Sequence, residues 1–186
     1  MDLREAIYTR RSVRAYADRP VDEKTLRTLI DAAVQAPSAI NEQPWAFTVV
    51  RDRALLDRIS RAAKAFMLAG LDPETGPRHF RELLGDPQFD IFYRAPALVV
   101  VSAVKSQWAV EDCALAAATL MLAARAAGLG TCWIGFAQGW LGTPDGKAAL
   151  DLPAAHLPVA PIIVGHPAAE PSPVPRREPN IRWIGA

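Results

Sequence analysis

The sequence predicts a layered α/β protein in which helices cover a buried sheet. The apolar run Ala97–Val101 contains no polar side chain, which is typical of a strand that is covered on both faces. Residues 22–33 carry apolar side chains at helical spacing, which indicates a helix with one face toward a core. Residues 110–127 are mainly alanine and leucine, which predicts a helix that is buried on most sides.

The first third of the chain is expected to form three helices, a loop and a strand. Three aspartates stand where a carboxylate caps the first turn of a helix: Asp2, Asp22 and Asp52. The second helix must end before Pro37, because proline restricts the residue before it, and residues 37–44 are therefore a loop. Ala46–Val50 follows as a strand, and the third helix has Leu56, Ile59, Ala63 and Phe66 on one side.

The rest of the chain is less regular. Residues 67–93 contain many turn-forming glycines and prolines, Pro73 among them, and predict short helical pieces that form a lid or excursion. Gly128 ends the alanine-rich helix, a strand Thr131–Phe136 follows, and after a turn-rich piece comes a last strand, Val159–Val164. We expect residues 1–186 to form a single domain in which the proline-rich residues 167–186 are an extended arm. Such an arm has no core of its own, so we expect it to lie on a second copy of the chain.

Composition excludes several classes of function. The 186 residues carry 21 basic and 20 acidic side chains, and a net charge of +1 does not favour binding to nucleic acid or to an anionic membrane. No apolar segment approaches the roughly 20 residues that span a bilayer, and residues 1–12 contain no apolar stretch of signal-peptide type. Two cysteines, Cys113 and Cys132, are too few for a metal cage. We expect a cytoplasmic protein with two buried, reduced thiols.

A basic cluster follows the first helix. Arg10, Arg11, Ser12 and Arg14 offer guanidinium groups and a hydroxyl within five residues, which are the groups that grip a phosphate. A solvated basic helix end has the same composition, so the spacing alone leaves both interpretations open.

Two further segments have the residue types of a ligand site. The loop 36–45 is held by two prolines and offers the hydroxyl of Ser38 and the amide of Asn41 to a flat heteroaromatic ligand, or to neighbouring backbone groups in an ordinary loop. In residues 128–135, glycines bracket a short apolar strand and allow a ligand to approach the backbone closely. The chain has no GxGxxG, Walker, GxSxG or HExxH motif. Glu111 and Asp112 most simply complement the dipole of the alanine-rich helix.

Taken in this order, these segments resemble the nitroreductase family of FMN enzymes over nearly the whole chain. The matching pieces are residues 10–14, 36–39 with Asn41 and 43–45, Ala95-Pro96, the alanine-rich helix, 128–135, 165–167 and Arg176-Arg177. The resemblance implies an α+β fold, a three-layer α/β/α sandwich with a mixed central sheet, in an intertwined homodimer that builds each FMN groove from both subunits.

The resemblance also implies roles for individual residues. The FMN phosphate and ribityl chain would be gripped by Arg10, Arg11, Ser12 and Arg14, with help from Arg176 or Arg177. The loop residues would reach the FMN from the partner subunit or touch the edge of its isoalloxazine ring; they are Pro37, Ser38, Ala39, Asn41 and Gln43. Ile134 and Gly135 would lie against the flavin face. No side chain need be catalytic, because the flavin itself performs the redox step.

The activity that the resemblance implies is transfer of electrons from NADH or NADPH, through FMN, to a nitroaromatic, a quinone or an activated alkene in a two-step cycle. Two alternatives stay open. One is a specialised FMN enzyme of the dehalogenase, flavin-cleaving or dehydrogenase type. The other is a flavin-binding protein without catalytic activity. Residues 67–93 match no segment of the family. At the position of Phe136, other branches of the family carry different residues. The sequence therefore does not define the acceptor.

Overall fold

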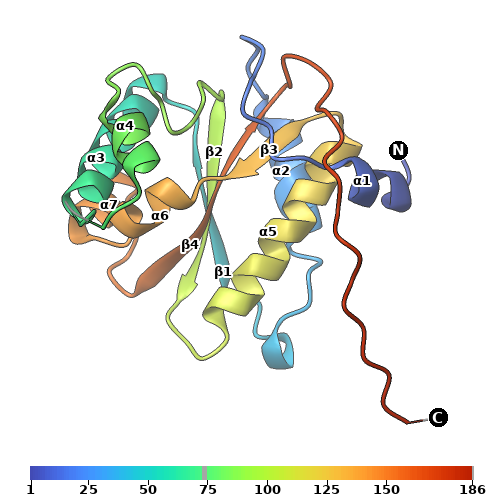
Figure 1. Cartoon of the computed structure of the whole chain (residues 1–186). Helices are drawn as coiled ribbons and strands as arrows, with labels where there is room; N and C mark the ends of the chain where they lie inside the picture. The colour runs from blue at the N-terminus through green and yellow to red at the C-terminus, as the bar shows by residue number, and fades with distance from the viewer. Residues whose placement is uncertain (73–74, 186) are drawn as a thin grey trace.

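The computed structural model describes residues 1–72 and 75–185. In this part of the chain four strands form one sheet in the order β1-β2-β4-β3 (Figure 1). The strands are β1 (Trp45–Val50), β2 (Ala97–Val104), β3 (Gly130–Trp133) and β4 (His156–Gly165). The three pairings between them are antiparallel. Parallel pairing, which the resemblance implied for a mixed sheet, is found in the described chain only as an isolated bridge between Ser12 and Thr131, beside the edge strand β3.

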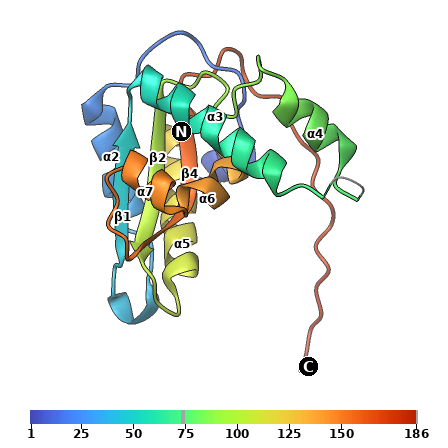
Figure 2. The same cartoon turned by 90° about the vertical axis from the view of Figure 1, so that its left-hand side faces the viewer.

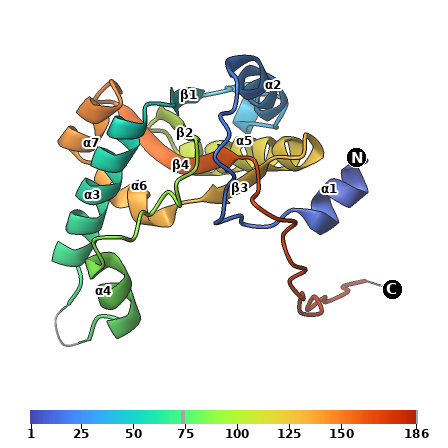
Figure 3. The same ribbon diagram turned by 90° about the horizontal axis from the view of Figure 1, so that it is seen from above.

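Helices cover both faces of the sheet, as the sequence predicts. The helices α2 (Glu23–Ala33) and α5 (Ala109–Ala126) lie on one face, and α3 (Arg53–Ala69), α6 (Gly135–Leu141) and α7 (Pro144–Ala149) lie on the other (Figures 1 and 3). Alternate residues of β2 enter the two cores: Val99 and Val101 pack with the first group of helices, and Leu98 and Val100 with the second. The three-layer α/β/α sandwich is therefore confirmed, and β2 lies inside the sheet as expected.

The predicted helix boundaries have the predicted causes. The short α1 (Leu3–Thr9) lies at the end of α5 where that helix terminates, and Asp2, Asp22 and Asp52 each accept a hydrogen bond from a backbone N–H in the first turn of α1, α2 and α3. Gly128 follows α5 with a φ of +74°, a conformation that glycine adopts without steric cost.

Two expectations about the second half are wrong in detail. The strand expected over residues 131–136 ends at Trp133, because Gly135 begins α6, which buries Ala137 and Leu141 one helical turn apart. The turn-rich piece contains α7, whose N-cap is Thr143 and whose first residue is Pro144. The sequence does not indicate α6, because its closely spaced glycines have a low helix propensity. One of them, Gly139, allows the ring of Phe66 to approach, because a Cβ there would lie 3.0 Å from it.

The last strand is longer than predicted. It begins at His156, three residues before the expected start, although it contains Pro158 and Pro161. A bulge between Val101 and Ser102 of β2 shifts the register opposite these prolines, which cannot donate to the sheet. The bulge is the local irregularity that accommodates these prolines.

After the end of α3, the described residues of the segment 67–93 contain the short helix α4 (Arg78–Gly85), which lies beyond α3 at the outer side of the molecule (Figure 2). This agrees with the expected short helical excursion. Pro73 lies outside the described residues. Lys64 of α3 is buried and donates hydrogen bonds to the backbone carbonyls of Asp86 and Phe89. These bonds hold the part of the segment that follows α4 against α3.

The C-terminal arm begins at the sheet and then leaves the body. Pro167 bridges to Tyr16, and the backbone N–H of Ala168 donates to the carbonyl of Ala15. Residues 171–185 are extended and mostly exposed (Figures 1 and 2). Within the part of the chain described, no helix combines the length and the apolar character needed to cross a bilayer.

Candidate functional site

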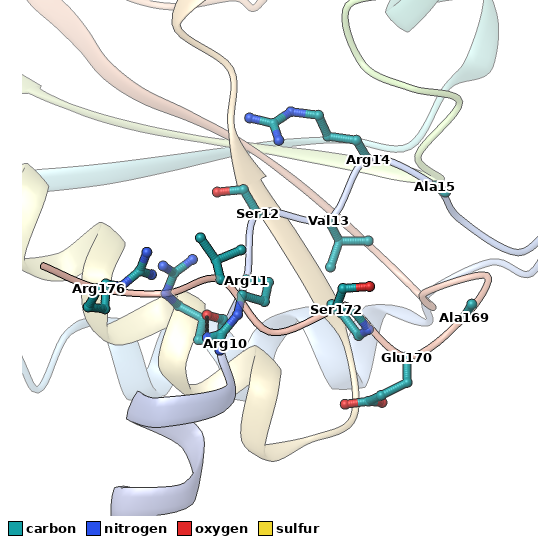
Figure 4. A pocket seen from close by; sticks show the side chains of 12 residues that line it. Arg10, Arg11, Ser12, Val13, Arg14, Ala15, Ala169, Glu170, Ser172 and Arg176 are labelled. Atoms are coloured by element: carbon teal, nitrogen blue, oxygen red, sulfur yellow. Dashed lines mark hydrogen bonds between the residues drawn. The ribbon is translucent and has the colours of Figure 1, made fainter.

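A cavity of about 490 Å³ lies between the segment that follows α1 and the beginning of the arm (Figure 4). Its lining includes five of the residues predicted from the sequence: Arg10, Arg11, Ser12, Arg14 and Arg176. Arg176 is about 160 residues away from the others along the chain, and the fold brings it to the same cavity. Arg177, its neighbour, does not line the cavity.

Backbone contacts to β3 hold the segment 10–14 in place. The N–H of Val13 donates to the carbonyl of Thr131 over 2.9 Å, next to the bridge between Ser12 and Thr131. Gly130 makes this approach possible, since a Cβ at that position would lie 2.8 Å from the side chain of Val13. Gly130 therefore serves the packing of two protein segments, whereas the sequence suggested close approach of a ligand.

The arginines of the cavity lack acidic partners. Among the described residues, none of Arg10, Arg11, Arg14 and Arg176 forms an ion pair. Arg11 donates through Nη1 to the carbonyls of Tyr8 and Arg10, which fixes its guanidinium, and its Nε is buried without a partner in the described chain. A buried donor without an acceptor costs free energy, and several uncompensated cations repel one another. An anionic ligand would relieve both costs.

A second cavity of about 260 Å³ adjoins the first at Arg14, which lines both. It lies where β3 passes into α6, and its lining includes two further predicted residues, Ile134 and Gly135. Of its other lining residues, Cys132 and Trp133 belong to the candidate segment 128–135 and Phe136 follows it directly, whereas sequence reasoning did not single out Met67 or Tyr93. Met67 and Tyr93 belong to the segment 67–93, so this segment reaches the site. The guanidinium of Arg14 lies 6.0 Å from the centre of the Tyr93 ring.

Burial raises the pKa of two tyrosines and a cysteine in and beside the second cavity. It raises the pKa of the Tyr16 and Tyr93 hydroxyls. Burial also raises the pKa of the Cys132 thiol, against the opposing effect of Arg14. A thiol and phenols that stay protonated near pH 7 are poor nucleophiles and poor bases. None of these three side chains is activated as a nucleophile or a base by its surroundings.

The predicted residues of the loop 37–43 lie at the other end of α5, away from both cavities (Figure 1). They are Pro37, Ser38, Ala39, Asn41 and Gln43. Within one chain the polar members bond to each other: the Gln43 N–H donates to Ser38 Oγ, and Gln43 Nε2 donates to Asn41 Oδ1. Ile40, Asn41 and Gln43 have positive φ angles, of 43°, 59° and 49°, so the loop has a defined and strained shape.

The sandwich and the arginine-lined cavity define the class of protein, an α/β sandwich with a site for an anionic ligand. The chain belongs to the nitroreductase family, because the model of the nitroreductase family matches residues 7–166.

Individual proteins agree with this assignment. The NADH dehydrogenase of Thermus thermophilus is 31% identical over an aligned length of 189, and the alignment covers 91% of this chain and 89% of that protein. The 5,6-dimethylbenzimidazole synthase of Rhodospirillum rubrum is 32% identical over an aligned length of 191, and the alignment covers 94% of this chain and 85% of that protein. The crystal structure of a nitroreductase with bound FMN from Bacteroides fragilis superimposes with a TM-score of 0.82 at 29% identity, and the match covers 100% of this chain and 98% of that one.

Proposed function

We propose that this protein passes electrons from NADH or NADPH, through a bound FMN, to a small organic acceptor in a two-step cycle. Its family makes it an NAD(P)H-dependent FMN oxidoreductase. The observation that carries the proposal for this chain is the cavity in which four arginines without acidic partners meet. FMN is an anion with a flat ring, and the two adjoining cavities match these two parts.

The phosphate of FMN would bind in the arginine-lined cavity. Arg11 is already oriented by its bonds to two carbonyls, so it would lose little freedom on binding an anion. Arg10, Arg14 and Arg176 would add charge, and Ser12 a hydroxyl. Arg176, which lines the cavity, is the better candidate than Arg177 for the contact from the arm.

The flat ring would lie in the second cavity, against Ile134 and Gly135. Bound FMN supplies the redox chemistry, by accepting two electrons from a nicotinamide and giving them up to an acceptor. The side chains around it orient the ring and keep water away, and none of them need exchange a proton. The mostly aromatic and apolar lining suits a flat acceptor, and we propose a nitroaromatic, a quinone or an activated alkene.

A homodimer completes this proposal. Apolar side chains are exposed on α1, at Leu3, Ile7 and Tyr8, and near the start of α5, at Trp108 and Val110. A second copy of the chain would cover such a surface and receive the extended arm of its partner. The loop 37–43, which lies away from the cavities of its own chain, would then reach the FMN of the other subunit. We further propose that residues 1–186 are one domain, with 167–186 as the arm.

A specialised reaction on the same cofactor is the second candidate. The similarity to the 5,6-dimethylbenzimidazole synthase supports it, because that protein matches over nearly the whole chain. A dehalogenase, a dehydrogenase or a protein that only binds flavin would hold FMN in the same two cavities. A cytoplasmic location stays a prediction, in accord with two buried free cysteines.

An absorbance spectrum of the purified protein tests the proposal. We expect flavin bands, either at once or after FMN is added, and bleaching of these bands when NADH or NADPH is added without oxygen. Protein that FMN does not reconstitute would refute the cofactor assignment. Flavin bands that neither nicotinamide bleaches would refute the redox role and favour a binding protein. Reoxidation by a panel of nitroaromatics, quinones and alkenes would separate a general reductase from a specialised enzyme.

A further inference from the structure

One acidic residue lines the cavity that the arginines define. Glu170, near the beginning of the arm, lies on the side opposite Arg10, Arg11 and Arg176 (Figure 4). A carboxylate has the charge and the acceptor geometry of a phosphate oxygen pair, so it is able to bind the same guanidinium groups. An unrestrained carboxylate at this position would therefore compete with an anionic ligand.

Arg125, in the last turn of α5, holds this carboxylate. Its Nη2 donates to Glu170 Oε1 over 2.6 Å. Its Nε donates to Thr9 Oγ1 over 2.9 Å, and the Thr9 hydroxyl in turn donates to the carbonyl of Glu5. The side chain of Arg125 is only 12% exposed. A guanidinium fixed by α1 and by its own helix thus fixes the direction of the Glu170 side chain.

The arrangement differs from the ordinary surface ion pair. Arg27 and Glu23, for example, are both largely exposed and lie one turn apart on α2, where such a pair contributes little. Arg125 and Glu170 are 45 residues apart, and the cation is largely buried, whereas the Glu170 side chain is 75% exposed. Arg125 also borders a small space together with Arg10 and Arg11, so its charge is close to the proposed phosphate site.

We propose that Arg125 is a positioning residue for FMN binding: it neutralises Glu170 and keeps its carboxylate away from the arginines that bind the phosphate. The inference rests on the proposed function, because it assumes that the arginine-lined cavity holds the FMN phosphate. In this scheme the ion pair with Arg125 makes Glu170 compatible with an anion site.

The test is a double-mutant cycle read by FMN affinity, measured as quenching of flavin fluorescence on titration with flavin-free protein. Arg125→Gln is expected to weaken FMN binding roughly tenfold, because it releases one negative charge beside the phosphate. Glu170→Gln, whose amide oxygen still accepts from Arg125, is expected to bind FMN as well as the unchanged protein or a few-fold more tightly. The double variant is expected to recover most of the affinity that Arg125→Gln loses.

A matched control separates local from general charge effects. Glu178 lies further along the same arm and does not line the cavity. Arg125→Gln with Glu178→Gln has the same net charge as the cycle's double variant, and it is expected to stay as weak as Arg125→Gln alone. Equal rescue by both double variants would overturn the proposal, because net charge would then explain the effect.

The outcomes distinguish this inference from the proposed function. Unchanged protein that binds no FMN would refute the proposed function itself. Unchanged protein that binds FMN, with Arg125→Gln equally tight or not rescued by Glu170→Gln, would refute the role of Arg125 alone. Should Arg125→Gln fail to fold, as judged by circular dichroism, Glu170→Gln still decides, because a several-fold loss of affinity in that variant would contradict the scheme.

Discussion

The carboxylate of Asp112 accepts a hydrogen bond from the backbone N–H of Ala39 over 3.0 Å, and so joins the start of α5 to a loop 73 residues earlier in the chain. Asp112 is only 3% exposed, and its second oxygen, Oδ2, is buried without a partner among the described residues. The sequence suggested that Asp112 complements a helix dipole. Its contact with the loop gives it a more specific structural role.

Replacing Asp112 with alanine is therefore expected to destabilise the protein by about 1–3 kcal/mol, because the Ala39 N–H loses its acceptor in a partly buried position. Asp112→Asn keeps an acceptor oxygen and is expected to cost less. Urea unfolding of flavin-free protein measures both. Equal stability of Asp112→Ala and the unchanged protein would show that the loop does not depend on this bond.

Arg11 and Arg177 are expected to differ sharply in their effect on the cofactor. Arg11→Ala should weaken FMN retention by about 1.5–3 kcal/mol, the usual range for a charge-assisted hydrogen bond. Arg177→Ala removes the same charge outside the cavity and should leave the affinity nearly unchanged. Equilibrium dialysis against FMN compares the two. Similar losses in both variants would mean that only the total charge matters.

Local signals in the sequence predicted most of the elements, because each had a cause within a few residues. Asp22 and Asp52 cap helices through bonds to residues three positions away. The missed helix α6 lacks such a cap, and its burial depends on contact with α3, which is distant in sequence. Local propensity cannot reveal an element that tertiary packing creates.

The candidate site was predictable in part for the same reason. Arg10, Arg11, Ser12 and Arg14 are adjacent in sequence, so composition alone identified them as a cluster. Tyr93 and Met67 reach the second cavity from an irregular segment, and no spacing rule connects them to Ile134. Glu170 has no sequence signal at all, because its role depends on Arg125 in another element. The order of the family motifs, and not hydrophobic periodicity, indicated that Arg176 near the end of the chain shares a site with the arginines of residues 10–14.

The end of the arm is expected to stabilise the proposed homodimer. Ile181, Trp183 and Ile184 are 57%, 86% and 91% exposed, which is unfavourable for large apolar side chains unless a partner covers them. Deleting residues 178–186 removes these side chains and keeps Arg176. We expect the truncated dimer to dissociate at a higher protein concentration than the unchanged one, as measured by sedimentation velocity over a concentration series. A truncated chain that sediments like the complete one would show that the arm is dispensable for assembly.

Gly130 is expected to be essential for the geometry of the basic segment. In Gly130→Ala the new Cβ would lie 2.8 Å from the Val13 side chain, and the segment 10–14 would have to move. Overpacking of this kind costs about 1–3 kcal/mol, and FMN affinity should fall as well, because the arginines shift with the backbone. Gly85→Ala is the control, since its Cβ would meet nothing within 4 Å. Thermal unfolding and FMN titration of both variants would test this, and equal behaviour would contradict it.

Alkaline pH is expected to destabilise the protein through Cys113. Burial, and to a lesser extent Asp112, raises the pKa of this thiol from 9.0 to about 12. The unfolded chain therefore loses the thiol proton at lower pH than the folded chain does. The stability is complete below the unfolded pKa, and it declines as the pH rises from about 9 toward the folded value. Cys113→Ala should flatten the decline measured by urea unfolding across this range, whereas an identical pH dependence in the variant would assign the decline to other groups.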